Sequence, residues 1–82
     1  MSEEVIREVT EILDYINENN TVPRNIRKAS HKASVMLNDD EKDESVKIST
    51  VLSKLDEISN DPNIPVHART LIWEVLSKLE AI

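Results

Sequence analysis

The two histidines, His31 and His67, are the side chains best suited to proton transfer or metal binding at neutral pH. They fall in different predicted helices, and neither has a second histidine at the four-residue spacing that helical zinc sites use. The chain has no cysteine, which excludes thiolate ligands, a cysteine nucleophile and disulfide bonds. We therefore predict that neither histidine belongs to a metal site.

A dense run of carboxylates, Asp39-Asp40-Glu41-Lys42-Asp43-Glu44, has the composition of a calcium-binding loop. It lacks the glycine and the closing bidentate glutamate that such a loop requires. Carboxylates also stabilise the first turn of a helix, where they face the positive end of the helix dipole. We predict that this run forms a solvated connection and the start of a helix.

Nucleotide chemistry and serine catalysis have no support in the sequence. The chain contains no glycine, so it has neither a phosphate-binding loop nor a dinucleotide fingerprint, both of which need the backbone to approach the ligand closely. No serine follows a strand in the sharp turn of a hydrolase or lies next to an evident base. We predict a protein that is not an enzyme and that uses no cofactor.

Five basic side chains follow one face of the predicted second helix, opposite its apolar face. They are Arg24, Arg27, Lys28, His31 and Lys32. This basic stripe can contact phosphates or an acidic protein, or it can be a solvated outer face. The solvated face is favoured, because nucleic-acid binding usually involves a basic domain and interleaved aromatic residues, whereas this chain has a net charge of −6 and no phenylalanine.

Trp73 falls outside the apolar stripe of the predicted fourth helix and shares its side with Val66, seven residues earlier. Tryptophan is enriched among the residues that dominate protein interfaces. The same position is compatible with a wider buried face that contacts a second neighbouring helix. Val66 and Trp73 are therefore the candidate interface with a protein partner or with a second copy of the chain.

The elements that must position these side chains are four helices. Apolar residues recur at helical spacing near residues 3–18, 23–37, 41–59 and 65–81. Pro23 and Pro65 are expected in the first turn of their helices, where a missing amide hydrogen costs nothing. The first helix is expected to end at residues 17–20, with an asparagine in the left-handed conformation that glycine usually supplies.

The turn between the first two helices returns before the fourth helix. Val22-Pro23-Arg24-Asn25-Ile26-Arg27 matches Ile64-Pro65-Val66-His67-Ala68-Arg69, an offset of 42 residues from Pro23 to Pro65. The shared proline and arginine indicate a duplicated helical hairpin. We expect Arg27 and Arg69 to donate hydrogen bonds to the exposed carbonyls that end the preceding helix.

Short connections favour antiparallel neighbours, so we predict an all-α, up-and-down four-helix bundle built from two tandem helix-turn-helix hairpins. A two-repeat helical solenoid is the alternative, since its repeats have a similar period. The bundle is favoured because it buries more of its own apolar surface. At 82 residues the chain corresponds to one domain, residues 1–82, for which association with a second copy is an open possibility.

The charge balance and the apolar runs place the protein in solution. The formal net charge of −6 disfavours indiscriminate binding to nucleic acid or to anionic lipid. No apolar run reaches the roughly 18 residues that cross a bilayer, and Ser2-Glu3-Glu4 lacks the basic residues that open an export signal. We expect a cytoplasmic protein that does not associate with membranes.

The two turn motifs carry a family resemblance. The first covers residues 20–27, and the second runs from Asn60 through Asp61-Pro62-Asn63-Ile64-Pro65 to Trp73. Together they resemble the small archaeal uncharacterised protein family 0147, over essentially the whole chain. The resemblance implies a compact four-helix protein of the archaeal cytoplasm. It brings no activity, cofactor or catalytic residue to transfer to this sequence.

Two functions follow as expectations. The first is a small non-enzymatic protein-interaction or scaffold module that binds an unknown protein partner, or a second copy, through Val66 and Trp73. The alternative is an accessory protein of RNA or of a ribonucleoprotein that binds through the basic stripe. Nucleic acid is the less favoured partner, because the overall charge opposes it.

Overall fold

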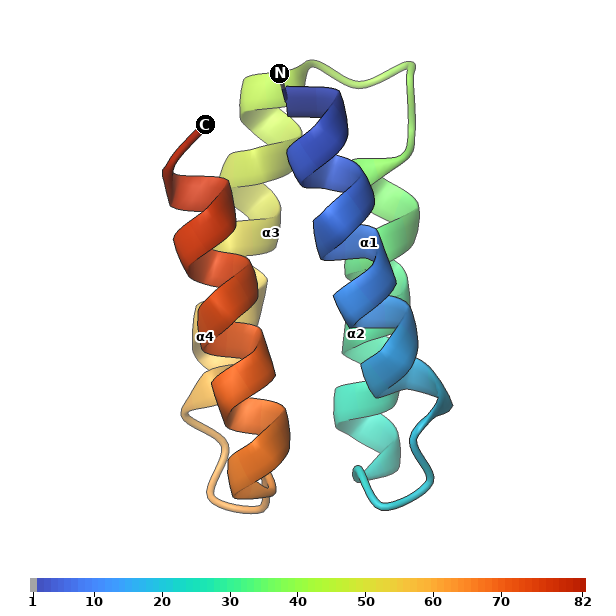
Figure 1. The fold of residues 1–82 in the computed structure, drawn as a ribbon, viewed down its shortest axis with the longest axis vertical. Helices are drawn as coiled ribbons and strands as arrows, with labels where there is room; N and C mark the ends of the chain where they lie inside the picture. Colours follow the sequence, from blue (N-terminus) through green and yellow to red (C-terminus); the bar gives the residue numbers. More distant parts are fainter. Residues whose placement is uncertain (1) are drawn as a thin grey trace.

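Four helices account for most of the chain in the computed structural model, which describes residues 2–82 (Figure 1). They are α1 (Ser2–Glu18), α2 (Arg24–Leu37), α3 (Glu44–Ser59) and α4 (Val66–Glu80). Each helix packs against two others: α1 contacts α2 and α4, and α3 contacts α2 and α4. The contact between α1 and α4 closes the bundle, which confirms the predicted fold and rules out an open two-repeat solenoid. None of the helices described is long and apolar enough to cross a membrane.

Three helices begin at positions that differ from the prediction for local reasons. Pro23 and Pro65 have ψ angles of 149° and therefore precede their helices instead of opening them. Their carbonyls accept the first helical hydrogen bonds, from the amides of Arg27 and Arg69, each at 3.0 Å. The helix α3 begins at residue 44 and not at 41, because the Asp39 carboxylate accepts the amide hydrogen of Glu41 at 3.0 Å and holds a turn there.

The end of α1 also differs from the prediction. None of residues 2–82 has a positive φ angle, so no asparagine adopts the left-handed conformation expected there. The Asn19 side chain instead accepts hydrogen bonds from the amide of Thr21 at 3.0 Å and from its hydroxyl at 2.7 Å. This local turn ends the helix by side-chain hydrogen bonding and needs no strained backbone.

Apolar side chains from all four helices and from two connections form the core. The buried apolar residues are Val9, Leu13, Ile16, Val22, Ile26, Ala33, Leu37, Val51, Leu55, Ile64, Ala68, Ile72, Val75 and Leu79. Ser30 is also fully buried, and its hydroxyl finds no hydrogen-bond partner among the described residues. Burial of this apolar surface is the main force that holds the helices together.

The two hairpins are related by an approximate two-fold arrangement. Asn25 donates from Nδ2 to Asp61 Oδ2 at 3.2 Å, and Asn19 Nδ2 lies 3.4 Å from His67 Nε2. With the offset of 42 residues, Asn19 corresponds to Asp61 and Asn25 corresponds to His67. The Asn25–Asp61 and Asn19–His67 contacts are therefore equivalent. Reciprocal contacts of this kind are the signature of two-fold packing. They support the predicted duplication.

The arginines that follow the two turns bind backbone carbonyls. Arg69 donates from Nε to Ser59 O at 3.0 Å and from Nη2 to Asp61 O at 3.3 Å, which confirms the predicted contact with the end of the preceding helix. Arg27 donates from Nε to Val22 O at 3.0 Å. Its acceptor therefore lies in the connection rather than at the end of α1, which corrects the prediction for Arg27.

Lys47 performs a similar role at the opposite end of the bundle. Its side chain is buried on the core side of α3, and its ammonium donates to Leu37 O at 3.2 Å and to Asp39 O at 3.0 Å. A buried ammonium is costly unless it is hydrogen-bonded. Here it satisfies Leu37 O at the end of α2, and Asp39 O in the connection that follows.

Candidate functional site

An open groove of 510 Å³ runs between α2 and α3. Its floor is made of buried and half-buried apolar side chains, and its rim is made mainly of exposed polar ones. The floor consists of Ala29, Ala33, Met36, Val51 and Ile58. The rim consists of Asn25, Lys28, Lys32, Thr50, Lys54 and Glu57. The site therefore joins an apolar surface to three ammonium groups and one carboxylate.

Small side chains on α2 create the opening. Ala29 and Ala33 are four residues apart and consequently lie one above the other on the side of α2 that faces α3. The sequence suggests that small residues let helices approach closely. At Ala29 the structure shows a different result, because this half-buried side chain lines an unfilled groove.

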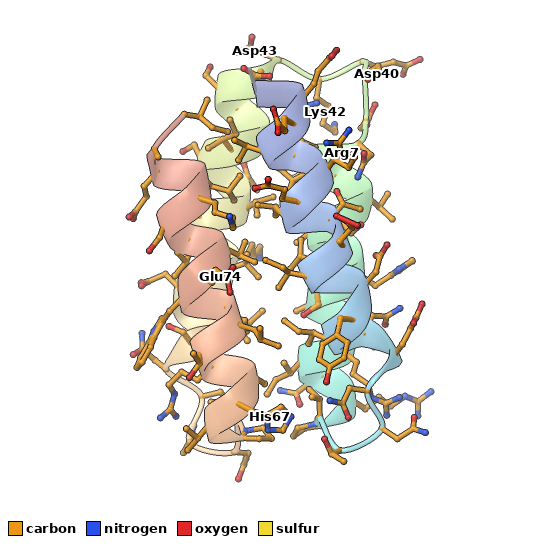
Figure 2. The ribbon with its side chains drawn as sticks, in the orientation of Figure 1. Arg7, Asp40, Lys42, Asp43, His67 and Glu74 are labelled. Carbon is orange, nitrogen blue, oxygen red and sulfur yellow. The ribbon has the colours of Figure 1, made fainter. Side chains whose placement is uncertain are left out.

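The two-fold arrangement supplies an internal comparison, because the offset of 42 residues relates the α2–α3 groove to the surface between α4 and α1. That second surface carries a smaller hollow of 360 Å³, which we call the α1–α4 hollow; Glu74 on its α4 side is labelled in Figure 2. Leu71 stands where the groove has Ala29, and Ile12 stands where it has Lys54. The larger Leu71 therefore occupies space that Ala29 leaves open in the groove, and Ile12 replaces a charged side chain by an apolar one.

Charge also differs between the two surfaces. The α1–α4 hollow is lined by Glu8, Glu11 and Glu74, and Lys78 there bonds Glu8 Oε1 at 3.1 Å. Glu74 corresponds by the same offset to Lys32 of the groove. One scaffold thus presents an acidic, partly filled surface on one side and a basic, open groove on the other. Because these surfaces lie on opposite sides of the bundle, the protein has a polarised charge distribution.

The structure divides the basic stripe predicted from the sequence. Arg24, Lys28, His31 and Lys32 are exposed, whereas Arg27 is half-buried and its Nε is hydrogen-bonded to the backbone. Only Lys28 and Lys32 belong to the groove. The groove therefore includes two of the five residues, and the role of the stripe as a polyanion contact remains a prediction.

Lys54 is the groove residue that the sequence analysis missed. It lies on α3, four residues before Ile58 and three after Val51, at the edge of the apolar stripe. The signal that could have identified it is this flanking position, which predicts a side chain between the core and solvent. To assign Lys54 to the groove one must also know that α3 packs against α2, and this pairing is a property of the tertiary structure.

Val66 and Trp73 lie on the outer side of α4, with 75% and 53% of their surface exposed. Neither lines the α2–α3 groove or the α1–α4 hollow. The Thr70 hydroxyl between them donates to Val66 O at 3.0 Å, a bond within the helix. These two exposed apolar side chains lie apart from the groove and from the hollow, and their role as an interface remains a prediction.

The other side chains that could take part in acid–base chemistry or metal binding are dispersed over the bundle. His67 lies at one end of the bundle, where its Nε2 is 3.4 Å from Thr21 Oγ1, and Figure 2 shows Asp40, Lys42 and Asp43 at the opposite end. Within residues 2–82 no three histidine, aspartate or glutamate side chains are grouped in a way that could hold a metal ion. The Asp43 carboxylate accepts the Ser45 hydroxyl at 2.7 Å, at the start of α3.

Comparison with known proteins identifies a family. The model of an uncharacterised protein family, UPF0147, matches residues 1–82. A UPF0147 protein of Methanothermobacter thermautotrophicus is 58% identical over 82 residues, which cover 100% of this chain and 80% of the relative. A UPF0147 protein of Methanocaldococcus jannaschii is 45% identical over 80 residues, which cover 98% of this chain and 86% of the relative.

Two crystal structures have the same fold. One is a protein from the UPF0147 family of Thermoplasma acidophilum, with a TM-score of 0.92 and 39% identity, covering 96% of this chain and 93% of that one. The other is MMP1188, a protein of unknown function, with a TM-score of 0.93 and 40% identity, covering 100% of this chain and 93% of that one. Both similarities extend over the whole bundle.

Proposed function

The chain belongs to the uncharacterised archaeal family UPF0147, and on that premise we propose that it is a small, non-enzymatic interaction module that binds a protein partner through the α2–α3 groove. We place this activity in the cytoplasm. One observation carries the proposal: the groove is open and basic, whereas the equivalent surface of the same scaffold is partly filled and acidic.

The comparison of the α2–α3 groove with the α1–α4 hollow supports a binding role for the groove. Both surfaces are formed by one helix from each hairpin, so their linings can be compared position by position. The groove has Ala29 where the α1–α4 hollow has Leu71, and Lys54 where the hollow has Ile12. An apolar floor within a polar rim is also the usual composition of a protein interface.

The basic stripe is less suited to binding RNA than to binding a protein. One of its five members is already engaged by the backbone, and two others lie outside the groove. Base stacking on aromatic side chains supplies much of the affinity for single-stranded nucleic acid. Tyr15 lies at the α1–α4 hollow, Trp73 lies on the outer side of α4, and neither lines the groove.

The proposal is tested by affinity capture from extracts of the organism's own cells. Tagged wild type and Ala29→Leu are compared, each with and without nuclease, and bound proteins are quantified by mass spectrometry. Ala29→Leu introduces into the groove the side chain that Leu71 supplies in the counterpart. Ala81→Leu adds the same side chain at the exposed end of α4 and serves as the matched control.

We expect wild type and Ala81→Leu to retain a defined protein partner after nuclease treatment. The amount of this partner captured by Ala29→Leu should be lower by about tenfold or more. Retention by Ala29→Leu together with loss by Trp73→Ala would move the interface to the outer side of α4. Loss of every partner on nuclease treatment would instead favour the ribonucleoprotein alternative. Either result would overturn the assignment to the groove.

A further inference from the structure

We propose that the occupant of the α2–α3 groove is an amphipathic helix of the partner protein, with carboxylates on both flanks of its apolar stripe. This inference rests on the proposed function and specifies the chemistry of the partner. It is carried by the dimensions of the groove, its apolar floor and the positions of its three lysines.

The dimensions suit a short helix. On α2 the lining runs from Asn25 to Met36, which spans about 16 Å at about 1.5 Å per residue. A bound helix of about three turns has the same length. An extended peptide binds either as an added strand at the free edge of a sheet or as a polyproline II helix in an aromatic-lined groove. Residues 2–82 contain no strand, and no aromatic residue lines this groove.

The floor fits the apolar stripe of such a helix. Ala29, Met36 and Ile58 are half-buried, so they retain apolar surface that a ligand can cover. A helix that inserts in a groove uses anchors at positions i, i+3 or i+4, and i+7. The small Ala29 leaves space for one large anchor side chain, whereas Leu71 occupies the equivalent space in the α1–α4 hollow.

The rim determines the charge of the partner. Lys28 and Lys32 lie four residues apart on the α2 side, and Lys54 lies on the α3 side, so ammonium groups border the floor on both sides. Glu57 is the one carboxylate in the lining. In a protein of net charge −6, this local excess of positive charge selects an acidic partner and repels a basic one.

The probe is a phage-displayed library of random 14-residue peptides, selected on the 82-residue chain and counter-selected on its Ala29→Leu variant. We expect the selected sequences to share an apolar stripe at helical spacing, with glutamate or aspartate on both flanks. Binding of synthetic versions should weaken with added salt, because the rim contacts are solvent-exposed charge pairs. The absence of selected peptides, or the absence of acidic enrichment, would overturn the inference.

A charge swap tests the lysines directly. Lys28→Glu/Lys32→Glu/Lys54→Glu should weaken a selected peptide by about tenfold, because several exposed ion pairs become repulsive together. A peptide with its flanking glutamates changed to lysine should recover binding to this variant. The matched control, Arg7→Glu/Arg24→Glu/Lys42→Glu, changes the net charge equally at exposed positions outside the groove; Figure 2 labels Arg7 and Lys42. Equal weakening by both triple variants would contradict a specific role for the rim.

Two further outcomes would assign a different occupant to the groove. A wild-type dimer that Ala29→Leu converts into a monomer, measured by light scattering after size exclusion, would make the occupant a second copy of this chain. Groove-dependent binding of a mixed-sequence RNA oligonucleotide, measured by fluorescence anisotropy, would make it a nucleic acid. If affinity capture shows a groove-dependent protein partner while the peptides lack acidic flanks, the proposed function stands and this inference alone fails.

Discussion

Substitution of Ala29 by leucine should raise stability and at the same time weaken partner binding by about tenfold or more. Each buried methylene contributes about 0.8 kcal/mol, and leucine adds three carbon atoms to alanine. The equivalent Leu71 is half-buried, so we count about half of the full value. Subtraction of about 0.2 kcal/mol for helix propensity leaves a gain of about 1 kcal/mol in the free energy of unfolding.

The measurement is urea unfolding monitored by circular dichroism, with thermal unfolding as a second assay. A gain of about 1 kcal/mol raises Tm by roughly 4–8 °C in a domain of this size. Substitution into a closed core instead costs about 1–3 kcal/mol, because side chains and backbone must shift. A loss of 1 kcal/mol or more for Ala29→Leu would therefore refute the open groove.

Leu71→Ala is the matched control on the opposite surface. It removes a half-buried side chain from the α1–α4 hollow and should lower the free energy of unfolding by about 1–2 kcal/mol. Since that hollow is not the proposed binding site, the Leu71→Ala variant should still bind the partner at temperatures where the variant is folded. Loss of binding in the more stable variant and retention in the less stable one cannot both result from unfolding.

Further predictions concern the polar contacts inside the bundle. Arg69→Met should cost about 3 kcal/mol and Arg27→Met about 1.5 kcal/mol, because Arg69 donates two hydrogen bonds to carbonyls and Arg27 donates one; equal costs in urea unfolding would contradict this reasoning. Lys47→Met should cost about 2 kcal/mol, since it removes the buried hydrogen bonds to Leu37 O at the end of α2 and to Asp39 O in the following connection; an unchanged unfolding midpoint would contradict it. Ser30→Ala should leave the free energy of unfolding unchanged or raise it by up to about 1 kcal/mol, because the buried hydroxyl has no partner within the described structure; a loss above 1 kcal/mol would show that the hydroxyl is bonded.

Helical periodicity was sufficient to predict the bundle, because apolar residues recur at helical spacing in each helix and the connections are short. Val9 and Leu13 in the first helix, and their counterparts Val51 and Leu55 in the third, are all buried. The matching turns also predicted the relation between the hairpins. Helix starts were less accurate, because a carboxylate such as Asp39 can hold a turn within a segment that has helical composition.

The groove could not be predicted, because it depends on which faces of α2 and α3 meet. From the sequence, Lys28 and Lys32 belong with Arg24 and His31 on one outer face, and Lys54 stands alone. Packing instead brings Lys54 to the same groove as Lys28 and Lys32. Ala29 is similarly ambiguous, since a small residue fits both a tight helix contact and an open groove.

Site-specific photo-cross-linking tests the central claim most directly. A photoreactive amino acid is placed at Thr50, which lines the groove, or at Thr70, which lies between Val66 and Trp73 on the outer side of α4. After irradiation in cell extract, the cross-linked partner segment is identified by mass spectrometry. Adducts from position 50 that disappear when Ala29→Leu is added, with none from position 70, are the predicted result. Adducts from position 70 alone would contradict a binding site between α2 and α3.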